Sequence, residues 1–337
     1  MAADPVLAAL AGGEWRSGQA LAADLGVTRA AVWKAIERLR REGYRIEAEA
    51  GRGYRLLGAP DRLLPGEIAK HFRPRRFAGG VVHRDEVDST NRLAIELARG
   101  GAPEGTAVVG EKQTAGRGRL GRTWESPPGL NLYLSVILRP ALSPVEVPRL
   151  TLAAAVAVAD AIAATTGLRP EIKWPNDVLV DGRKACGILT ELEAEAERVR
   201  FVVVGIGVNL NAREEDFPPE LRDKATSLAI ALGRRVDRAA FTGALLAEFE
   251  RVYEEMLAGG FAAIRPRYES RHGLPGRRVS IEGGAGVEGV VRGIDDEGAL
   301  VVETDAGPRR VLSGEVTLRA TYASSRDGGL RRGPGGV

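Results

Sequence analysis

The sequence predicts an α+β protein with several domains, and three observations predict it. Residues 1–60 combine helical patterns with a hairpin pattern. Residues 64–272 have strands at hairpin spacing with helices between them, which indicates a mixed α+β domain and not a doubly wound parallel sheet. Residues 273–320 are a run of short strands separated by Gly/Asp turns. A chain of 337 residues has room for these domains.

The first region has the pattern of a winged helix-turn-helix. Ser17 and Thr28 are suited to cap helices, and Gly26 is suited to make the turn between two of them. Apolar residues at three- and four-residue spacing predict helices over residues 5–11, 18–25 and 29–41. Alternating strands at residues 44–48 and 54–57 flank a Gly-Arg-Gly turn and supply the wing.

The third helix has a basic face at the position that docks into a DNA major groove. The predicted groove contacts, with a phosphate contact from the wing, are Arg29, Ala30, Ala31, Lys34 and Arg52. Val32 and Ile36 are expected in the core of the module. A protein–protein adaptor of the same fold, with a solvated basic face, is the alternative, because a fold alone does not determine a function.

Residues 58–65 form a short linker, and helices and strands follow it in the central domain. The expected helices cover residues 66–71, 91–99, 150–165 and 241–257. Strands are expected at residues 81–83, 131–138, 184–189 and 201–211 and on both sides of a turn at residues 174–177. The C-terminal strands, at residues 278–282, 286–294, 299–304 and 309–313, predict a small SH3-like β-barrel. Residues 321–337, rich in Gly, Arg and Pro, are expected to be a disordered tail.

Residues 113–124 alternate glycines with arginines and end in an aromatic residue, Trp124. Glycine allows the backbone to approach a ligand closely, and arginine supplies a permanent charge suited to phosphate or carboxylate. A solvated basic turn and an RNA-binding Arg-Gly segment are the alternatives. Apolar segments flank the stretch on both sides, which places it inside a folded domain and favours an anion-binding loop.

Three further motifs contain more polar or flexible residues than their local structure needs. The Asp-Ser-Thr-Asn run at residues 88–91 can simply cap a helix, but it can also hold a polar ring or a carboxylate. A turn at residues 173–177 needs Pro, Asn and Asp, whereas Lys173 and Trp174 are additional. A hairpin brings Lys184 near Asn176, and the glycines of residues 205–209 permit close approach to a ligand.

Composition excludes several classes of protein. The formal net charge of +3 argues against a generally nucleic-acid-coating protein, though not against one local basic surface. With Cys186 as the single cysteine, no intramolecular disulfide is possible, and we expect the cytoplasm. The three histidines have no metal-ligand spacing. No signal pattern and no apolar run of spanning length occurs, so no membrane association is expected. Dinucleotide and Walker fingerprints are absent as well.

Five motifs in order resemble the bifunctional biotin–protein ligase and biotin operon repressor family of bacteria, over roughly residues 5–320. These are residues 88–91, 116–122, 173–177, 184–189 and 205–209. The resemblance implies a central fold similar to the class II aminoacyl-tRNA synthetase core. It implies that biotin and Mg-ATP give biotinyl-5′-adenylate and pyrophosphate, after which a lysine of a biotin carboxyl carrier protein attacks the adenylate and releases AMP.

The resemblance also implies roles for individual residues. Biotin is expected at Ser89, Thr90, Asn91, Gln113, Arg117, Gly118, Arg119 and Lys184. The adenylate is expected at Trp124, Lys173, Asn176 and Asn209, and Mg²⁺ at Asp177, which is otherwise explained by the turn itself. Lys184, Arg119 and Arg117 are the expected catalytic residues. The best-known form of the loop has a further arginine where this chain has Leu120, and the apolar side chain is expected to fold onto Trp124 or the ligand.

The expected chemistry suits these residue types. A carboxylate is already nucleophilic, so adenylation needs cations where charge develops and no general base. In the family the adenylate acts as corepressor, which implies operator DNA as a partner and a homodimer when the adenylate is bound. Two alternatives stay open: a ligand-sensing transcription factor without ligase activity, and a lipoate ligase of related fold, which the Arg-Gly loop and the Lys-Trp-Pro-Asn-Asp turn disfavour.

Overall fold

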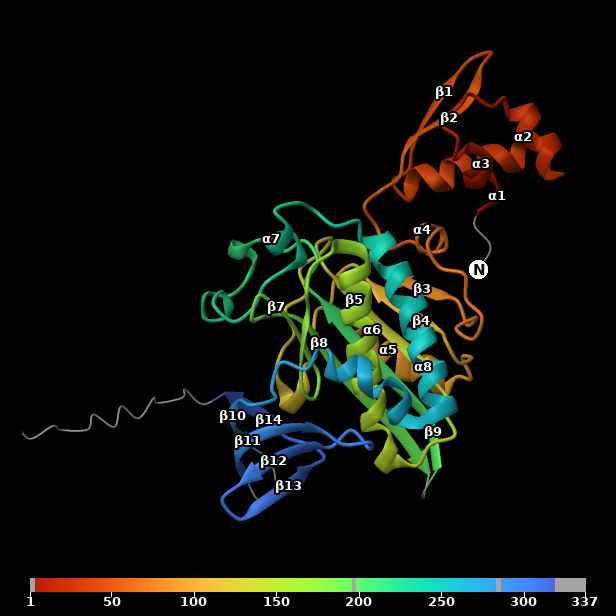
Figure 1. The fold of residues 1–337 in the computed structure, drawn as a ribbon. Coiled ribbons are helices and arrows are strands. Elements are labelled where there is room, and N and C mark those ends of the chain that lie inside the picture. The colour runs from red at the N-terminus through yellow and green to blue at the C-terminus, as the bar shows by residue number, and fades with distance from the viewer. Residues whose placement is uncertain (1–3, 196–197, 283–285, 319–337) are drawn as a thin grey trace, which may run out of the picture.

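The structure, a computed structural model, describes residues 4–195, 198–282 and 286–318. Figure 1 shows an N-terminal module, a central sheet domain and a small C-terminal sheet. This arrangement confirms the predicted fold class. The predicted tail, residues 321–337, lies outside the described residues.

The N-terminal module contains the predicted helices and wing. Its elements are α1 (Pro5–Leu10), α2 (Gly18–Leu25), α3 (Arg29–Arg41), β1 (Arg45–Glu49) and β2 (Gly53–Gly58). The Ser17 and Thr28 side chains accept hydrogen bonds from the backbone N–H groups of Ala20 and Ala31, at 3.0 and 3.1 Å. Gly26 ends α2 at φ +64°, a conformation that glycine adopts without steric cost. The predicted caps and turn are therefore confirmed.

Seven strands form the central sheet in the order β3-β4-β5-β9-β8-β7-β6. Their bounds are β3 (Val81–Arg84), β4 (Ala107–Gly110), β5 (Leu132–Leu138), β6 (Glu171–Lys173), β7 (Asp177–Val180), β8 (Arg183–Glu195) and β9 (Arg198–Val208). β3 pairs with β4 in parallel and the other pairs are antiparallel, which confirms a mixed sheet. β8 and β9 form a longer hairpin than expected, and their register places Gly187 opposite Gly207.

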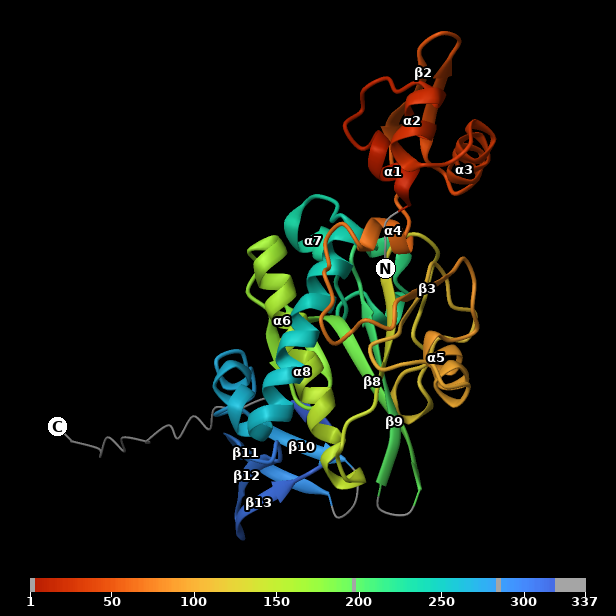
Figure 2. The same ribbon diagram turned by 90° about the vertical axis from the view of Figure 1, so that its right-hand side faces the viewer.

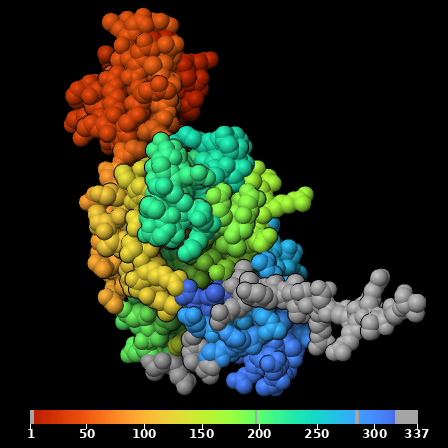
Figure 3. Space-filling model, turned by 90° about the vertical axis from the view of Figure 1, so that its left-hand side faces the viewer, coloured from red at the N-terminus to blue at the C-terminus, as the bar shows by residue number. Residues whose placement is uncertain are grey.

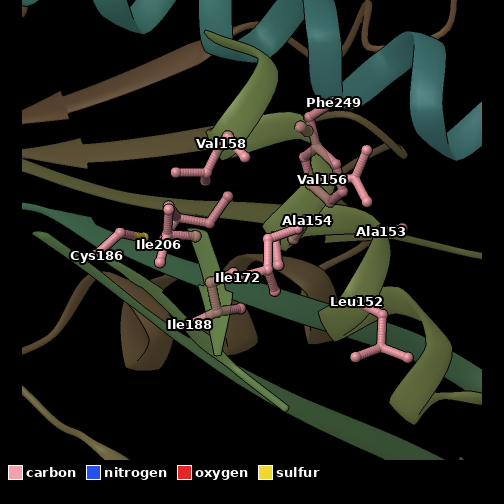
Figure 4. Packing of buried hydrophobic residues seen from close by; sticks show 14 of the residues in the cluster. Leu152, Ala153, Ala154, Val156, Val158, Ile172, Cys186, Ile188, Ile206 and Phe249 are labelled. Carbon is pink, nitrogen blue, oxygen red and sulfur yellow. The ribbon is translucent and has the colours of Figure 1, made fainter. Parts of the chain in front are cut away.

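Helices cover both faces of this sheet (Figure 2). On one face α5 (Thr90–Arg99) packs through Ala94 and Ala98 against Val108, Ile137 and Phe201 of the strands. On the other face lie α6 (Pro148–Thr166) and α8 (Arg238–Glu269). Figure 4 shows side chains of α6 between the sheet and Phe249 of α8. Two short helices, α4 (Pro65–Ile68) and α7 (Leu228–Leu232), complete the domain.

One helical stretch of the described residues, 144–166, is long and apolar enough to cross a membrane. The sequence-based expectation that no apolar run reaches this length was therefore wrong. The most apolar window of the stretch is 67% buried inside the protein, where small alanines let the helix pack closely on the sheet. A core helix of this kind passes the same test of length and composition, so the stretch is weak evidence for a membrane span.

The C-terminal domain is an antiparallel sheet in the order β13-β12-β11-β10-β14. Its strands are β10 (Arg278–Glu282), β11 (Val287–Ile294), β12 (Leu300–Thr304), β13 (Gly307–Val311) and β14 (Glu315–Leu318). The last strand was not among those predicted, and it forms one edge of the sheet by pairing with β10. Helix α8 continues to Glu269, twelve residues beyond its predicted end at 257, and is interrupted at Gly260, where φ is +67°.

The buried side chain of His272, which follows the end of α8, should make the free energy of unfolding depend on pH. Neither ring nitrogen of His272 has a hydrogen-bond partner among the residues that the structure describes, and burial lowers the pKa of this side chain to about 4. The unfolded chain then binds a proton below its ordinary pKa of 6.5, whereas the folded chain does not. Stability should fall on the order of 3 kcal/mol between pH 6.5 and 4. Urea unfolding of the His272→Phe variant should show a shallower fall across this window than the parent protein; an equal fall would contradict the assignment.

Candidate active site

A pocket lies where the start of α5, the Arg-Gly loop and strands β5, β8 and β9 converge. It holds about 50 Å³ of open space, and the predicted residues lining it are Ser89, Thr90, Asn91, Gln113, Arg117, Gly118, Arg119, Trp124, Asn176 and Lys184. Residues far apart in the sequence thus meet in one cavity. The pocket is small for a ligand site, because such sites usually enclose about 300–1,000 Å³.

The start of α5 is tied to the loop by Gln113. Its side-chain oxygen accepts hydrogen bonds from the backbone N–H of Thr90 at 2.9 Å and from the Thr90 hydroxyl at 3.2 Å. Its amide nitrogen donates to Ser126 at 2.9 Å. Ser89 occupies the N-cap position, but its side chain makes no capping hydrogen bond. The capping explanation of this motif therefore does not apply to the Ser89 hydroxyl.

Asn91 lies against the sheet at a point where only glycine fits. A Cβ atom at Gly205 would come within 2.1 Å of the Asn91 Oδ1 atom. The buried Ser135 hydroxyl lies 2.6 Å from Asn91 Oδ1 and 2.8 Å from the Thr90 hydroxyl. Ser135 was not among the predicted residues, because it lies in a continuous buried strand whose pattern gives no sign that one serine faces a site.

The Arg-Gly loop contacts the C-terminal domain, as the yellow and dark blue surfaces of Figure 3 show. Arg119 donates to the Gly314 carbonyl at 3.3 Å and to Asn176 Oδ1 at 2.9 Å. Arg122 pairs with Glu315, and this hydrogen bond holds the pKa of the Glu315 carboxyl below its usual value. Burial lowers the pKa of Arg119, although the nearby carboxylates of Asp177 and Glu315 oppose the change. A network across two domains therefore positions the loop.

Leu120 does not fold inward as expected. Its side chain is 75% exposed, and its backbone has φ +56°, a left-handed conformation that is uncommon for a residue other than glycine. The reason is the adjacent pair of arginine contacts with the C-terminal domain, which direct the tip of the loop outward.

The Trp124 indole lies on a surface that two cross-strand glycines create. A Cβ atom at Gly207 would come within 2.6 Å of the indole Nε1 atom, and one at Gly187 within 2.9 Å of Cζ3. The indole N–H is buried and has no hydrogen-bond partner among the described residues. Packing of the ring on these glycines accounts for the small size of the pocket.

Lys184 supplies the cation at the open side of the pocket. Its Nζ atom lies 2.6 Å from Asp177 Oδ1 and 5.6 Å from the centroid of the Trp124 ring. The β7–β8 hairpin brings these groups together, since Asp177 pairs with Gly187 across it. One carboxylate, one ammonium group and the loop arginines make an electrostatic environment that favours anions.

Three residues predicted for this site do not line the pocket, namely Asn209, Lys173 and Asp177. Asn209 is buried and donates from its side chain to the Thr226 carbonyl at 3.1 Å, which is a structural contact. Lys173, on the neighbouring strand β6, is close enough to Glu315 to lower the pKa of that carboxyl. The Asp177 carboxylate pairs with Lys184, which does line the pocket.

No group of three His, Cys, Asp or Glu side chains that could hold a metal ion occurs within the described residues. Asp177 is the carboxylate that the sequence assigned to a metal, and it is paired with Lys184. A single carboxylate is still suited to Mg²⁺, because this ion is often bound by one or two carboxylates together with phosphate oxygens and water.

Known proteins share both the domain order and the fold. Residues 84–209 match the biotin/lipoate A/B protein ligase family, residues 7–55 an HTH domain, and residues 276–319 the biotin protein ligase C-terminal domain. The chain is 44% identical over 311 residues to the bifunctional ligase/repressor BirA of Bacillus subtilis. The matched region covers 91% of this chain and 95% of that protein. The chain belongs to the bifunctional ligase/repressor family.

Two further relatives agree with this membership. The bifunctional ligase/repressor BirA of Escherichia coli is 33% identical over 316 residues, 94% of this chain and 96% of that protein. The solved structure of a biotin protein ligase from Aquifex aeolicus in complex with biotin and ATP matches with a TM-score of 0.63 and 33% identity. That match covers 71% of this chain and 98% of the Aquifex chain.

Glu191 joins two residues of the pocket, Arg117 and Asn91, that belong to separate sequence motifs. One of its oxygens lies 3.0 Å from Arg117 Nη1 in the loop, and the other accepts a hydrogen bond from Asn91 Nδ2 at 2.8 Å. Sequence reasoning missed this residue because it lies in a strand where charged and apolar residues alternate. Its position two residues after Leu189, which lines the pocket, was the available signal.

The arginine predicted at the wing tip is already engaged within the winged module. Arg52 stacks on Trp15 at 4.5 Å and pairs with Glu49 at 2.9 Å. Arg55 lies over the Trp15 ring as well, 4.9 Å from its centroid. The wing therefore presents ordered cations, and a phosphate contact from Arg52 stays a prediction.

Proposed function

We propose that the chain forms biotinyl-5′-AMP from biotin and ATP and transfers biotin to a lysine of a biotin carboxyl carrier protein. The observation that carries the proposal is the convergence of Thr90, Gln113, Arg119 and Lys184 on one pocket in a ligase/repressor chain. Ser89, Thr90, Asn91 and Gln113 would bind biotin, together with Arg117 and Gly118. Trp124 and Asn176 would contact the adenylate, with Lys173 and Asn209 supporting it from beside the pocket.

In the first step the biotin carboxylate attacks the α-phosphorus of ATP, and pyrophosphate leaves. Lys184 and Arg119 would reduce the repulsion between the two anions and stabilise the charge of the transition state. Asp177 holds the ammonium group of Lys184 at 2.6 Å, so the cation is positioned before substrate binds. Mg²⁺ would neutralise phosphate charge, and Asp177 is the side chain that would hold it. The loop would close over the mixed anhydride and exclude water.

In the second step the carrier lysine, as its neutral amine, attacks the acyl carbon of the adenylate. The new C–N bond forms, the bond from that carbon to the phosphate oxygen breaks, and AMP leaves while the amine loses its proton to solvent. No residue of the chain needs to become covalently modified. The chain would need only to hold the adenylate in one orientation and the acceptor close to it.

The winged module supports a second role as a repressor that binds operator DNA in response to the adenylate. The exposed, strained Leu120 at the tip of the loop is an apolar surface available to a second copy, which supports a homodimer when the adenylate is bound. A coupling of this kind requires the adenylate to bind the dimer more tightly than the monomer. The cytoplasm, where ATP and the carrier occur, is the proposed location.

Incubation with labelled biotin, ATP and a biotin carboxyl carrier domain tests the ligase. Label on the carrier lysine is expected, and its absence would leave a sensor without ligase activity. Lipoate should fail to compete for labelling, and effective competition would favour the lipoate ligase. Gel-shift titrations test the repressor: biotin plus ATP should tighten binding to operator DNA more than biotin alone. DNA binding that does not depend on biotin or ATP would refute the repressor role.

Glu191→Gln should weaken biotin binding more than it slows transfer. The variant keeps an acceptor for Asn91 but loses the charge that holds Arg117, so we expect KM for biotin to rise about tenfold, the equivalent of a hydrogen bond to a charged group. The rate at saturating biotin should change much less. Steady-state pyrophosphate release separates the two constants.

Glu193→Gln is the matched control, because Glu193 lies on the same strand but pairs with Arg99 and Arg200 away from the pocket. It should behave like the parent protein. If the two variants have the same KM for biotin, Glu191 has only a structural role.

A further inference from the structure

The cationic side chains of the recognition helix α3 differ in whether they have partners within the module. Arg38 pairs with Asp4 and, at 3.2 Å, with Glu42, while Arg40 pairs with Glu37 at 2.8 Å and donates to the Ile46 carbonyl at 2.9 Å. These contacts hold the C-terminal half of the helix within the module. Arg41, at the end of the helix, donates to the Glu37 carbonyl at 3.3 Å. By contrast, Arg29 and Lys34 have no ion pair or side-chain hydrogen bond within the described part of the chain, so the N-terminal half presents cations without a partner.

An exposed tryptophan lies on this same half of the helix. Trp33 is 55% exposed, and Val27, in the turn before the helix, is 44% exposed. Ala30 is also exposed and lies one turn before Trp33, on the same side of the helix. Exposure of so much apolar surface costs free energy, because burying a large side chain is worth about 1.5–3 kcal/mol. The described residues leave more than half of the Trp33 surface uncovered.

The charges around Trp33 indicate what would cover it. Arg29 lies four residues before it and Lys34 follows it directly, so cations flank the apolar surface. Glu37, the acidic residue one turn further on, is neutralised by Arg40. An apolar centre between unpaired cations fits a surface that is apolar in the middle and anionic at its edges. The major groove at a thymine has this character, since it presents the C5-methyl group between two phosphate backbones.

We infer that Trp33, with Ala30 beside it, contacts thymine methyl groups in the operator and is a determinant of sequence preference, while Arg29 and Lys34 contact phosphates. This inference rests on the proposed function, namely that α3 binds operator DNA. Beyond that function, it names one side chain of the protein, Trp33, and the base that this side chain contacts, thymine. The N-terminal part of a recognition helix is the part that reaches base edges, and Trp33 lies at its centre.

The test uses the full-length protein with biotin and ATP and duplexes selected from a random-sequence pool by the parent protein. Each thymine of the selected duplex is replaced in turn by deoxyuridine, which removes only the methyl group. At one or two positions the parent protein should lose about tenfold in affinity, as for a mismatched base pair. Trp33→Ala should lose about the same for the unsubstituted duplex, and deoxyuridine at those positions should then cost it nothing more.

Control variants separate this contact from general effects. Leu57→Ala removes an apolar side chain that is similarly exposed, at 51%, from strand β2 of the same module, and it should bind like the parent protein. Lys34→Ala should weaken binding to selected and unrelated duplexes alike and reduce the salt dependence. Circular dichroism and thermal unfolding check that Trp33→Ala remains folded.

The outcomes distinguish the inference from the function beneath it. If the parent protein selects no sequence, operator binding itself fails. If it selects a sequence but deoxyuridine costs the parent and Trp33→Ala equally, or Trp33→Ala binds like the parent, DNA binding stands and the role of Trp33 is refuted. Loss of the deoxyuridine effect in Trp33→Ala, and in no control variant, supports the inference.

Discussion

Lys184→Met should slow adenylate formation by about 10²–10³-fold, because removal of one preorganised electrostatic group at a reacting centre typically costs this much. The loss has two physical parts. The variant lacks the cation that faces both anionic substrates, and it leaves the Asp177 carboxylate, 2.6 Å from the former ammonium group, without its partner beside the pocket. Single-turnover pyrophosphate release with saturating biotin and ATP measures the effect.

Three variants make the Lys184 result interpretable. Lys184→Arg keeps the charge with a different shape and should retain part of the rate. Asp177→Asn removes the negative partner and shows how much of the loss arises from an unpaired carboxylate. Lys224→Met is the matched control, because Lys224 contacts Lys184 only through a backbone hydrogen bond of 2.8 Å, from the Lys184 N–H to the Lys224 carbonyl. Lys184→Met with a rate close to that of Lys224→Met would refute the catalytic assignment.

Local features of the fold were predictable from the sequence because they depend on neighbouring residues. Ser17, Thr28 and Gly26 have physical reasons to cap and turn helices at their own positions, and the structure has them there. The polar helix start and the Lys-Trp turn were recognisable for a similar reason, since each contains side chains that its local structure does not need.

Features that depend on strand register were not predictable in this way. The β8–β9 register places Gly187 opposite Gly207 and so makes the surface on which Trp124 lies. Ser135 and Glu191 belong to the site only because their strands present them beside Asn91. The direction of Leu120 depends on arginine contacts with a domain nearly two hundred residues away in the chain, which no local pattern reports.

A buried ionic network is the least predictable feature and has a large effect on stability. Arg238, at the start of α8, has no exposed side-chain surface; it pairs with Glu111 at 2.9 Å and with Asp61 of the linker at 2.8 Å. Glu111 also accepts a hydrogen bond from the Leu63 backbone at 2.7 Å. Burial alone would raise the pKa of Glu111, but His83, Arg238 and the Leu63 N–H lower it to about 2. The network therefore fixes the linker of the winged module to the strand that leads into Gln113.

Arg238→Ala should destabilise the protein by about 3–5 kcal/mol, because it leaves a buried carboxylate without its cation. Chemical unfolding followed by circular dichroism measures this loss. The exposed pair of Arg235 with Asp61 is the control: its cation is 61% exposed, so Arg235→Ala should cost less than about 1 kcal/mol. Similar losses in the two variants would mean that the linker contact, and not burial of the charge, determines stability.

The pH dependence gives an independent check on the same network. Because Glu111 has a folded pKa of about 2 against an ordinary value of 4.5, its contribution is complete above pH 4.5 and is lost as pH falls toward 2. The loss should be on the order of 3 kcal/mol in the parent protein. Most of this range lies below the His272 window, which ends near pH 4, so the two groups are separable in one titration of stability. In Arg238→Ala the lower step should shrink, since Arg238 is one of the groups that lower the Glu111 pKa; an unchanged step would show that Leu63 and His83 suffice to hold the carboxylate ionised.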